Sequence, residues 1–380
     1  MPVTITKLQS RLMRGYYQYF SKYARGKAPQ QKVAWVTSFT PIEILEALGM
    51  AYYYPESYAA VIAASGKEQE LISDSEQRSL NKDCCSYSCC FEGCLSLEEG
   101  PRGVPPKPDI LIATNNQCNT LPGWWNIIAK RYNVPLIVID YPGESTSRDM
   151  ALPYVTAQHK KLIGVLEDLT GIKLDYSVLS EKIENSRRSI AAWNQITHLL
   201  KQKDMEPSAL FDDINFLITA RSKEETSVMY EMMRDSILEN PDDNGTKLPL
   251  FWLGYPLWYH ESRYLSELLD GCRIVGSNYI TWWSLDYTGS DCFESLFNAY
   301  NYTFLNLNQE SRNNRLGDVI KDSGAKGAIV LHNKSCKCDY VSALEIPIPQ
   351  AELQIDMIDR NFLDVDRAKA QIELLKETLQ

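Results

Sequence analysis

The feature that most constrains the fold is a repeating unit of a short apolar run, a polar loop and a helical pattern. In the first part of the 380-residue chain the apolar runs are Val33–Val36, Ile110–Ala113 and Leu136–Ile139, and the loops TSFTP, TNNQCNT and DYPG follow them. Short apolar strands that alternate with helices are typical of parallel sheets covered on both faces. The sequence therefore predicts an α/β protein.

The same unit returns in the last part of the chain, after the turn-rich stretch NPDDNGTKLP at 240–249. Its apolar runs are Leu250–Leu253, Arg273–Val275 and Gly327–Leu331, which precede GYP, GSNYI and HNKSCKC. We therefore expect a second α/β domain, which ends in an amphipathic helix at 366–379.

Between these two parts the strand pattern is missing. Apolar residues at helical spacing predict a long helix at 175–202, with Asp175 or Ser177 as its N-cap, and shorter helices near 207–220 and 223–239. The expected organisation is an N-terminal helix at 1–30, a first α/β domain at 31–154, a helical segment at 155–244 and a second α/β domain at 245–380.

Composition and hydropathy exclude several classes of function. The chain has 39 Lys and Arg against 49 Asp and Glu, a net charge of −10, whereas nucleic-acid binding requires a basic surface. The longest apolar runs, such as PLIVID, are far shorter than the roughly 20 residues that span a bilayer. The N-terminus lacks the apolar core of a secretory signal. We expect a cytoplasmic protein that binds neither nucleic acid nor membrane.

A dense group of thiols points to metal or redox chemistry. The segment KDCCSYSCCFEGC at 82–94 contains five of the 10 cysteines, and clustered thiols in the cytoplasm more often bind metal than form disulfides. Packing alone and structural zinc are the alternatives, but zinc sites favour paired C-x₂₋₄-C spacings on small scaffolds. An iron–sulfur cluster is favoured, because such clusters take thiolates from distant parts of a chain.

Further cysteines are expected to meet at the edges of the two sheets. Ligands bind outside the carboxyl ends of parallel strands. Cys118 follows the run at 110–113, and Cys336 and Cys338 follow the run at 327–331. If the two α/β domains face each other, these thiols converge on the cleft between them.

The cysteine-rich segment itself is expected to begin a helix at Cys84 or Cys85, where a helix N-terminus stabilises a thiolate. Along that helix Cys85 shares a face with Cys89, and Cys90 shares a face with Cys94.

With these cysteines in place, the sequence resembles the catalytic subunits of the 2-hydroxyacyl-CoA dehydratase and benzoyl-CoA reductase superfamily. The resemblance covers most of the chain after about residue 30. Its motifs, in chain order, are TPIEILEALG (40–49), the Cys-Ser-Tyr at 85–87, PDILIATNNQCNT (108–120), PLIVIDYP (135–142), HNKSCK (332–337) and AQIELLKETL (370–379).

The resemblance implies a fold, a cofactor and a partner. It implies two Rossmann-like domains with a helical segment between them, and Cys85, Cys118 and Cys336 as ligands of a 4Fe–4S cubane in the interdomain cleft. It also implies an enzyme that receives low-potential electrons from a separate ATP-hydrolysing activator protein and acts on a small-molecule substrate.

The chain has more cysteines than a single cubane needs. Cys84, Cys89, Cys90, Cys94 and Cys338 are extra, a surplus that resembles the double-cubane (8Fe–9S) proteins of the same superfamily, which would need about six thiolates. On that resemblance we predict an oxidoreductase, and a homodimer fits a chain with its own full ligand set. A dehydratase or benzoyl-CoA reductase subunit with one 4Fe–4S cluster, and a non-catalytic zinc or cluster-carrier protein, are the alternatives.

Several other polar residues are candidates for the site. His332 would donate a hydrogen bond to a cluster sulfur or a proton to substrate, or be an ordinary loop histidine. Glu43 would face the cleft as a proton donor, or simply favour a helix start. Asn115, Asn116 and Gln117 suit hydrogen bonds to cluster sulfides, and turn formation is the alternative.

Two tryptophan pairs, at 124–125 and 282–283, are expected to pack in the core or between domains rather than against substrate.

Overall fold

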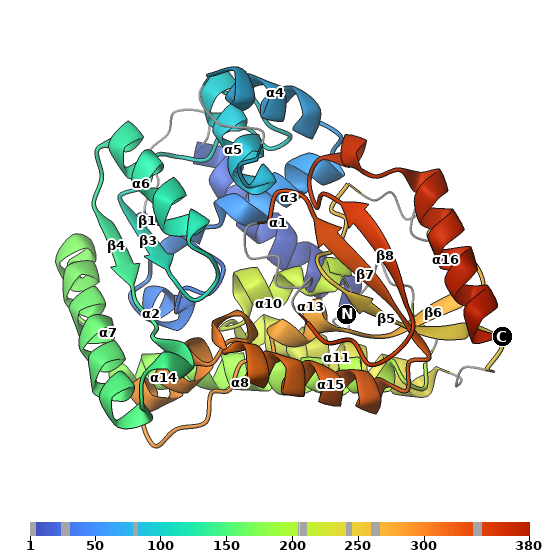
Figure 1. The fold of residues 1–380 in the computed structure, drawn as a ribbon. Coiled ribbons are helices and arrows are strands. Elements are labelled where there is room, and N and C mark those ends of the chain that lie inside the picture. The colour runs from blue at the N-terminus through green and yellow to red at the C-terminus, as the bar shows by residue number, and fades with distance from the viewer. Residues whose placement is uncertain are drawn as a thin grey trace.

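The computed structural model describes residues 5–23, 31–78, 83–203, 205, 211–240, 245–259, 267–336 and 344–380. In this part of the chain two separate four-stranded parallel sheets lie on opposite sides of the molecule, with helices around and between them (Figure 1). The sequence-based prediction of an α/β fold with two parallel sheets is confirmed.

The first sheet has the strand order β2-β1-β3-β4, and all neighbours are parallel. Its strands are β1 (Val33–Val36), β2 (Ala51–Tyr53), β3 (Ile110–Thr114) and β4 (Leu136–Ile139). β1 and β3 are buried along their whole length, as expected for central strands covered on both faces.

The second sheet repeats this plan with the order β6-β5-β7-β8. Its strands are β5 (Leu248–Leu253), β6 (Cys272–Ser277), β7 (Gly327–Asn333) and β8 (Gln350–Ile355). The strands β2 and β8 were not predicted from the sequence. β8 is an edge strand in which exposed and buried residues alternate, so it lacks a continuous apolar run.

The helices of the first part surround its sheet. α4 packs closely against α5, and α5 also contacts α3. The bounds of these helices are α1 (Ile5–Tyr23), α2 (Ile42–Ala47), α3 (Pro55–Ala64), α4 (Glu68–Arg78), α5 (Ser86–Leu97) and α6 (Thr120–Tyr132).

The central helices are α7 (Arg148–Thr170), α8 (Tyr176–Leu199), α10 (Asn215–Ala220) and α11 (Glu224–Glu239). Asp175 is the N-cap of α8 and accepts a hydrogen bond from the Ser177 backbone N–H at 2.8 Å. The expected boundary at 154/155 lies inside α7. α8 contacts α2 of the first part and α13 and α14 of the last part, so it joins the two sheet regions along the lower side of the view in Figure 1.

The helices of the last part are α13 (Asn278–Trp282), α14 (Cys292–Asn301), α15 (Gln309–Ser323) and α16 (Val365–Leu379). Short 3₁₀ turns are η1 (Gly143–Ser145), η2 (Phe304–Asn306) and η4 (Arg360–Phe362). α16 packs against β7 and β8 and closes the outer side of the second sheet.

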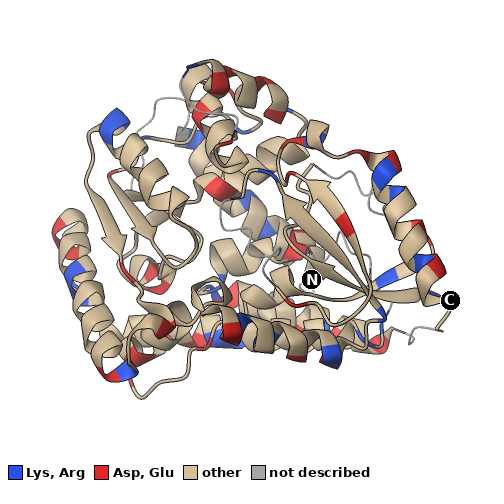
Figure 2. Ribbon diagram, in the orientation of Figure 1, with Lys and Arg blue, Asp and Glu red and all other residues tan. Residues whose placement is uncertain are grey.

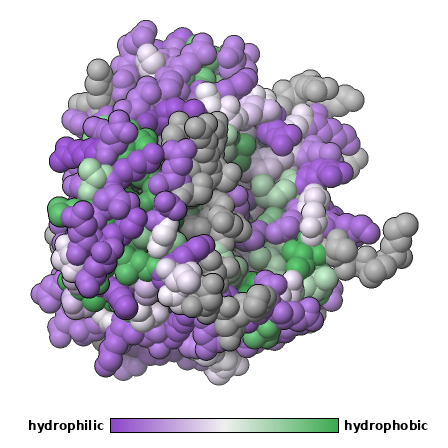
Figure 3. Space-filling view, turned by 90° about the vertical axis from the view of Figure 1, so that its right-hand side faces the viewer, coloured by the Kyte–Doolittle hydropathy of each residue, from purple (hydrophilic) through white to green (hydrophobic). Residues whose placement is uncertain are grey.

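Charged residues lie mainly on the outer helices, and the strands carry almost none (Figure 2). The face that Figure 3 shows is mostly hydrophilic, with smaller hydrophobic areas between the polar side chains. Among the described helices, none combines the length and the apolar character that crossing a membrane requires.

Candidate functional site

A cavity of about 520 Å³ opens between the carboxyl ends of the two sheets. The segments that follow β1, β3, β5, β6, β7 and β8 all contribute lining residues, and helices α1, α3 and α10 complete the wall. This is the edge at which parallel sheets bind ligands. We call this cavity the central pocket.

Three thiols line the central pocket, from three distant segments of the chain. Cys118 lies in the loop between β3 and α6, Cys336 lies just after β7, and Cys85 is the N-cap of α5. The sequence placed Cys118 and Cys336 beyond the carboxyl ends of two strands, and in the fold both residues line the central pocket.

A pair of serines joins two of these thiol-bearing segments. The Ser86 backbone N–H donates to Ser335 Oγ at 3.1 Å, and Ser335 Oγ donates to Ser86 Oγ at 2.8 Å. Both serines are buried. Because each is adjacent in sequence to a pocket cysteine, the pair fixes Cys85 and Cys336 relative to each other across the two domains.

The Cys85 thiol is in surroundings that disfavour a free thiolate. Burial raises the pKa of Cys85 well above its usual value, and the neighbouring Cys118 raises it further. Close, buried thiols ionise together only when a positive centre compensates their charge. Within the described residues, no three His, Cys, Asp or Glu side chains are placed to hold a single metal ion.

The other cysteines of the rich segment do not line this pocket. Cys89, Cys90 and Cys94 are buried on α5, on the side that packs against α3 and α4. Burial raises the pKa of Cys89 and of Cys94 to about 12. Cys84 is half-buried and is not a lining residue either. The remaining predicted ligand, Cys338, lies outside the described residues.

A carboxyl group that the sequence analysis missed faces the pocket. Glu56, in the first turn of α3, accepts hydrogen bonds from the Ser38 backbone N–H and from Ser38 Oγ, both at 3.0 Å. Burial raises the pKa of Glu56 to about 7, against the opposing effect of the hydrogen bonds from Ser38 and Gln117. A carboxyl with this pKa can hold and release a proton near neutral pH. Nothing in its local sequence distinguishes it from other helix-start glutamates.

The three amides of the loop after β3 have different surroundings. Gln117 lines the pocket beside Glu56. Asn115 instead accepts from the Tyr141 backbone N–H at 2.7 Å, and Asn116 donates to the Tyr300 backbone oxygen at 2.7 Å. Asn115 and Asn116 therefore hold the loop in place, and only Gln117 is positioned to reach a ligand.

His332 and Glu43 both lie away from the pocket lining. His332 belongs to β7, which extends further than the sequence predicted, and its Nε2 lies 3.5 Å from Glu352 Oε2 on β8. Glu43 is fully buried and pairs with Arg221, whose Nε lies 3.3 Å from Glu43 Oε1. The Arg221 guanidinium thus holds the Glu43 carboxylate in a buried ion pair outside the pocket lining.

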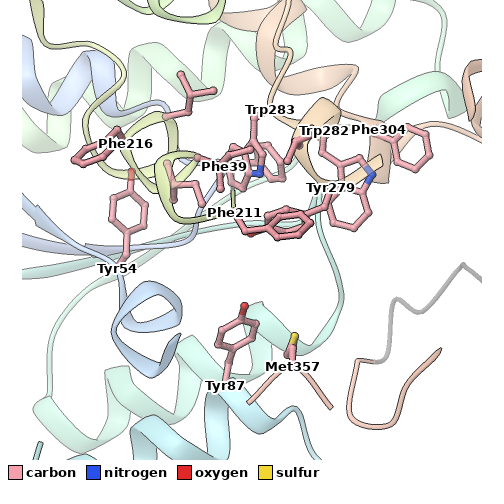
Figure 4. Close-up of a cluster of buried hydrophobic side chains, with 14 of the residues drawn as sticks. Phe39, Tyr54, Tyr87, Phe211, Phe216, Tyr279, Trp282, Trp283, Phe304 and Met357 are labelled. Carbon is pink, nitrogen blue, oxygen red and sulfur yellow. The ribbon is translucent and has the colours of Figure 1, made fainter. Parts of the chain in front are cut away.

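Aromatic rings form most of the remaining wall. Trp283 stacks on Phe39 with ring centroids 4.5 Å apart, and Tyr279 packs against Trp282 at 5.2 Å. Figure 4 shows these rings on one side of an open space, with Tyr87 on the other side. All four tryptophans of the two pairs are buried, as predicted, and Trp124, Trp282 and Trp283 also line the pocket.

Comparison with known proteins agrees with this geometry. Residues 37–379 match the family described as "2-hydroxyglutaryl-CoA dehydratase, D-component". The chain belongs to this family. The resemblance inferred from the sequence motifs is thereby confirmed.

Relatives within this dehydratase family and its superfamily cover most of the chain. The lactoyl-CoA dehydratase subunit alpha of Anaerotignum propionicum is 28% identical over 83% of this chain and 83% of its own length. The (R)-phenyllactyl-CoA dehydratase alpha subunit of Clostridium sporogenes is 27% identical, covering 81% and 77%. A benzoyl-CoA reductase subunit of Thauera aromatica is 23% identical, covering 89% and 87%. Relatives of both kinds are enzyme subunits, which supports an enzymatic function for this chain.

Proposed function

We propose that this chain is the cluster-bearing subunit of an oxygen-sensitive iron–sulfur enzyme, with Cys85, Cys118 and Cys336 as the ligands of a 4Fe–4S cubane. The observation that carries the proposal is the meeting of these three thiols at the central pocket. Cubane clusters accept thiolates from distant segments, and three thiolates leave one iron open to a non-protein ligand.

The chemistry would be electron transfer to a small substrate in the central pocket. When bound, the cluster would supply single electrons at low potential. Glu56 would hold the proton that the reaction consumes, and the two hydrogen bonds from Ser38 orient its carboxyl group. Both reactions named among the relatives need such an acid, since reduction takes up a proton and a hydroxyl leaves as water only after protonation.

The proposed partner is an ATP-hydrolysing iron–sulfur activator protein that delivers the electrons. The names of the relatives support a multi-subunit enzyme, since each of them describes one subunit of a larger enzyme. A cytoplasmic location and a homodimer are part of the same proposal. The substrate is a small molecule, and a 2-hydroxyacyl thioester is the class that the dehydratase relatives suggest.

A double-cubane (8Fe–9S) cluster is the second candidate. It is favoured by Cys84, which directly precedes Cys85, and by Cys89, whose pKa the neighbouring Cys84 raises. It would need about six thiolates. Because Cys90 and Cys94 face α3 and α4, further ligands would have to come from Cys84, Cys338 and a rearranged α5. One cubane requires no such rearrangement.

Anaerobic purification with iron and sulfide counts tests the proposal. One cubane predicts about four irons per chain, and a double cubane predicts about eight. An iron-free protein that binds zinc would refute both. Cys118→Ala should lose the iron, whereas Cys90→Ala, which removes a buried thiol outside the pocket lining, should keep it.

The catalytic part of the proposal needs a separate measurement. With an added activator protein, the reduced cluster should form only when ATP is hydrolysed. A protein that transfers its iron to an apo-acceptor and shows no ATP-dependent reduction would instead be a cluster carrier.

A further inference from the structure

The lining residues of the central pocket that the structure describes include carboxyl groups but no basic side chain. Glu56, Asp212 and Asp213 are its carboxyl groups, and no Lys, Arg or His is a lining residue. Burial raises the pKa of Asp213 to about 6, although Gln9 donates a hydrogen bond to it at 2.8 Å. The pocket thus disfavours the ionised form even of Asp213, one of its own carboxyl groups.

Aromatic rings form a large apolar part of the pocket wall. Trp283 and Phe39 present a stacked pair of rings, and the Tyr255 ring lies 5.3 Å from that of Trp282 in an edge-on contact. Figure 4 shows Met357 and Tyr87 on the opposite side of the open space. Such walls gain free energy from covering apolar groups and rings, and among the described lining residues they offer no cation to a carboxylate.

The small side chains of α3 leave room for a bulky group. Ala60, Val61 and Ala64 line the pocket on the same helix as Glu56. They place open apolar volume next to the polar end at which Glu56 and the thiols lie. A substrate whose reacting end meets Glu56 would therefore lay its side chain along this apolar wall.

We propose that the central pocket selects a substrate whose side chain is uncharged and bulky, either branched aliphatic or aromatic, and rejects a side chain that ends in a carboxylate. The inference rests on the proposed function, in that it takes the substrate to be an acyl thioester. Its physical basis is the cost of removing a carboxylate from water without a cation beside it.

The test is a binding measurement on the full chain, purified without oxygen. The probes are N-acetylcysteamine thioesters of 2-hydroxy-4-methylpentanoate, of 3-phenyllactate and of 2-hydroxyglutarate, followed by quenching of tryptophan fluorescence. The first two should bind about 100-fold more tightly than the glutarate ester. Equal or tighter binding of the glutarate ester, or binding of none of the three, would overturn the proposal.

A charge introduced on the wall gives an independent check. Val61→Lys should improve binding of the glutarate ester about tenfold and should not improve binding of the two uncharged esters. Val61→Met is the matched control of similar length without charge. If Val61→Lys does not fold, Ala64→Lys places the same charge at an exposed position of the same helix face. No gain from either lysine would count against the proposal.

These measurements need neither iron nor turnover, so they are separable from the proposed function. A protein without a cluster that still prefers the uncharged esters would keep the selectivity and refute the iron–sulfur enzyme. A protein with a reducible cluster but no preference among the esters would support the iron–sulfur enzyme and refute the proposed selectivity.

Discussion

The buried pair of Glu43 and Arg221 allows a quantitative prediction. Glu43 is fully buried and accepts hydrogen bonds from Ser186 Oγ at 2.6 Å, Tyr287 Oη at 2.7 Å and Tyr300 Oη at 2.7 Å. The Arg221 side chain, only 1% exposed, forms the ion pair with it. These residues come from α2, α8, the segment after α10 and the last part of the chain, so the network joins all parts of the fold.

Removing the charge of Glu43 should leave a buried guanidinium without its counter-ion. Breaking a buried pair in this way typically costs about 3–5 kcal/mol. Glu43→Gln keeps the shape and can still accept hydrogen bonds, so we expect a loss of about 3 kcal/mol in the free energy of unfolding. Glu43→Ala should lose about 5 kcal/mol, because it also leaves a cavity.

The network also supports the pocket. Arg221 Nη2 donates to the Thr40 backbone oxygen at 2.9 Å, and Thr40 lies two residues beyond Ser38. A variant that frees Arg221 should therefore loosen the loop that orients Glu56. We expect Glu43→Gln to reduce ATP-dependent activity even at temperatures at which the chain stays folded.

The assay is urea unfolding followed by tryptophan fluorescence and by circular dichroism, with coincidence of the two curves as the check for a single transition. Glu231→Gln is the matched control, since its partner Arg188 is 37% exposed and surface pairs contribute about 0–1 kcal/mol. A Glu43→Gln variant that loses no more stability than Glu231→Gln would refute the reasoning. The Glu43→Gln/Arg221→Met double variant should lose clearly less than the sum of the two single variants.

Three further changes test the site and its supports. If Glu56 acts as an acid with a pKa near 7, activity should fall as pH rises through about 7, and Glu56→Gln should abolish this dependence. Because the pKa of Glu56 is higher in the folded chain than in the unfolded chain, the folded state loses stability as the pH rises from about 4 to about 7. Glu56→Gln removes this loss, so it should raise the melting temperature more at pH 8 than at pH 5. Gly93→Ala should destabilise by about 1–3 kcal/mol, contrary to helix propensity, because a Cβ there would lie 1.9 Å from the Leu71 backbone oxygen; an unchanged or higher melting temperature would contradict this. Ser335→Ala, which breaks the link to Ser86, should speed loss of iron to a chelator while costing only about 1 kcal/mol of stability; an unchanged rate would show that the link does not hold the thiols.

Much of this architecture was readable in the sequence because it depends on local patterns. The apolar runs Val33–Val36 and Leu136–Ile139 coincide with β1 and β4, and the predicted helix at 175–202 with α8. The rule for the carboxyl ends of parallel strands placed Cys118 and Cys336 at one pocket. The family resemblance, carried by motifs in a fixed order, is confirmed by the family match.

Other features depended on contacts between distant residues. The sequence grouped eight cysteines, but packing of α5 against α3 and α4 turns Cys90 and Cys94 away from the pocket. Glu43 and Glu56 both begin helices and look alike in sequence. Arg221, far along the chain, holds Glu43 in a buried pair, whereas Glu56 has only hydroxyl, amide and backbone partners and faces the pocket.

The sequence by itself determined most of the strands, the long helix α8 and the sheet edge at which Cys118 and Cys336 gather, because hydrophobic periodicity acts over a few residues. Only the tertiary structure decided which carboxyl group keeps a proton near neutral pH and which thiols meet. The physical reason is that a pKa and a ligand set are properties of the surroundings, and these surroundings are assembled from segments that lie hundreds of residues apart.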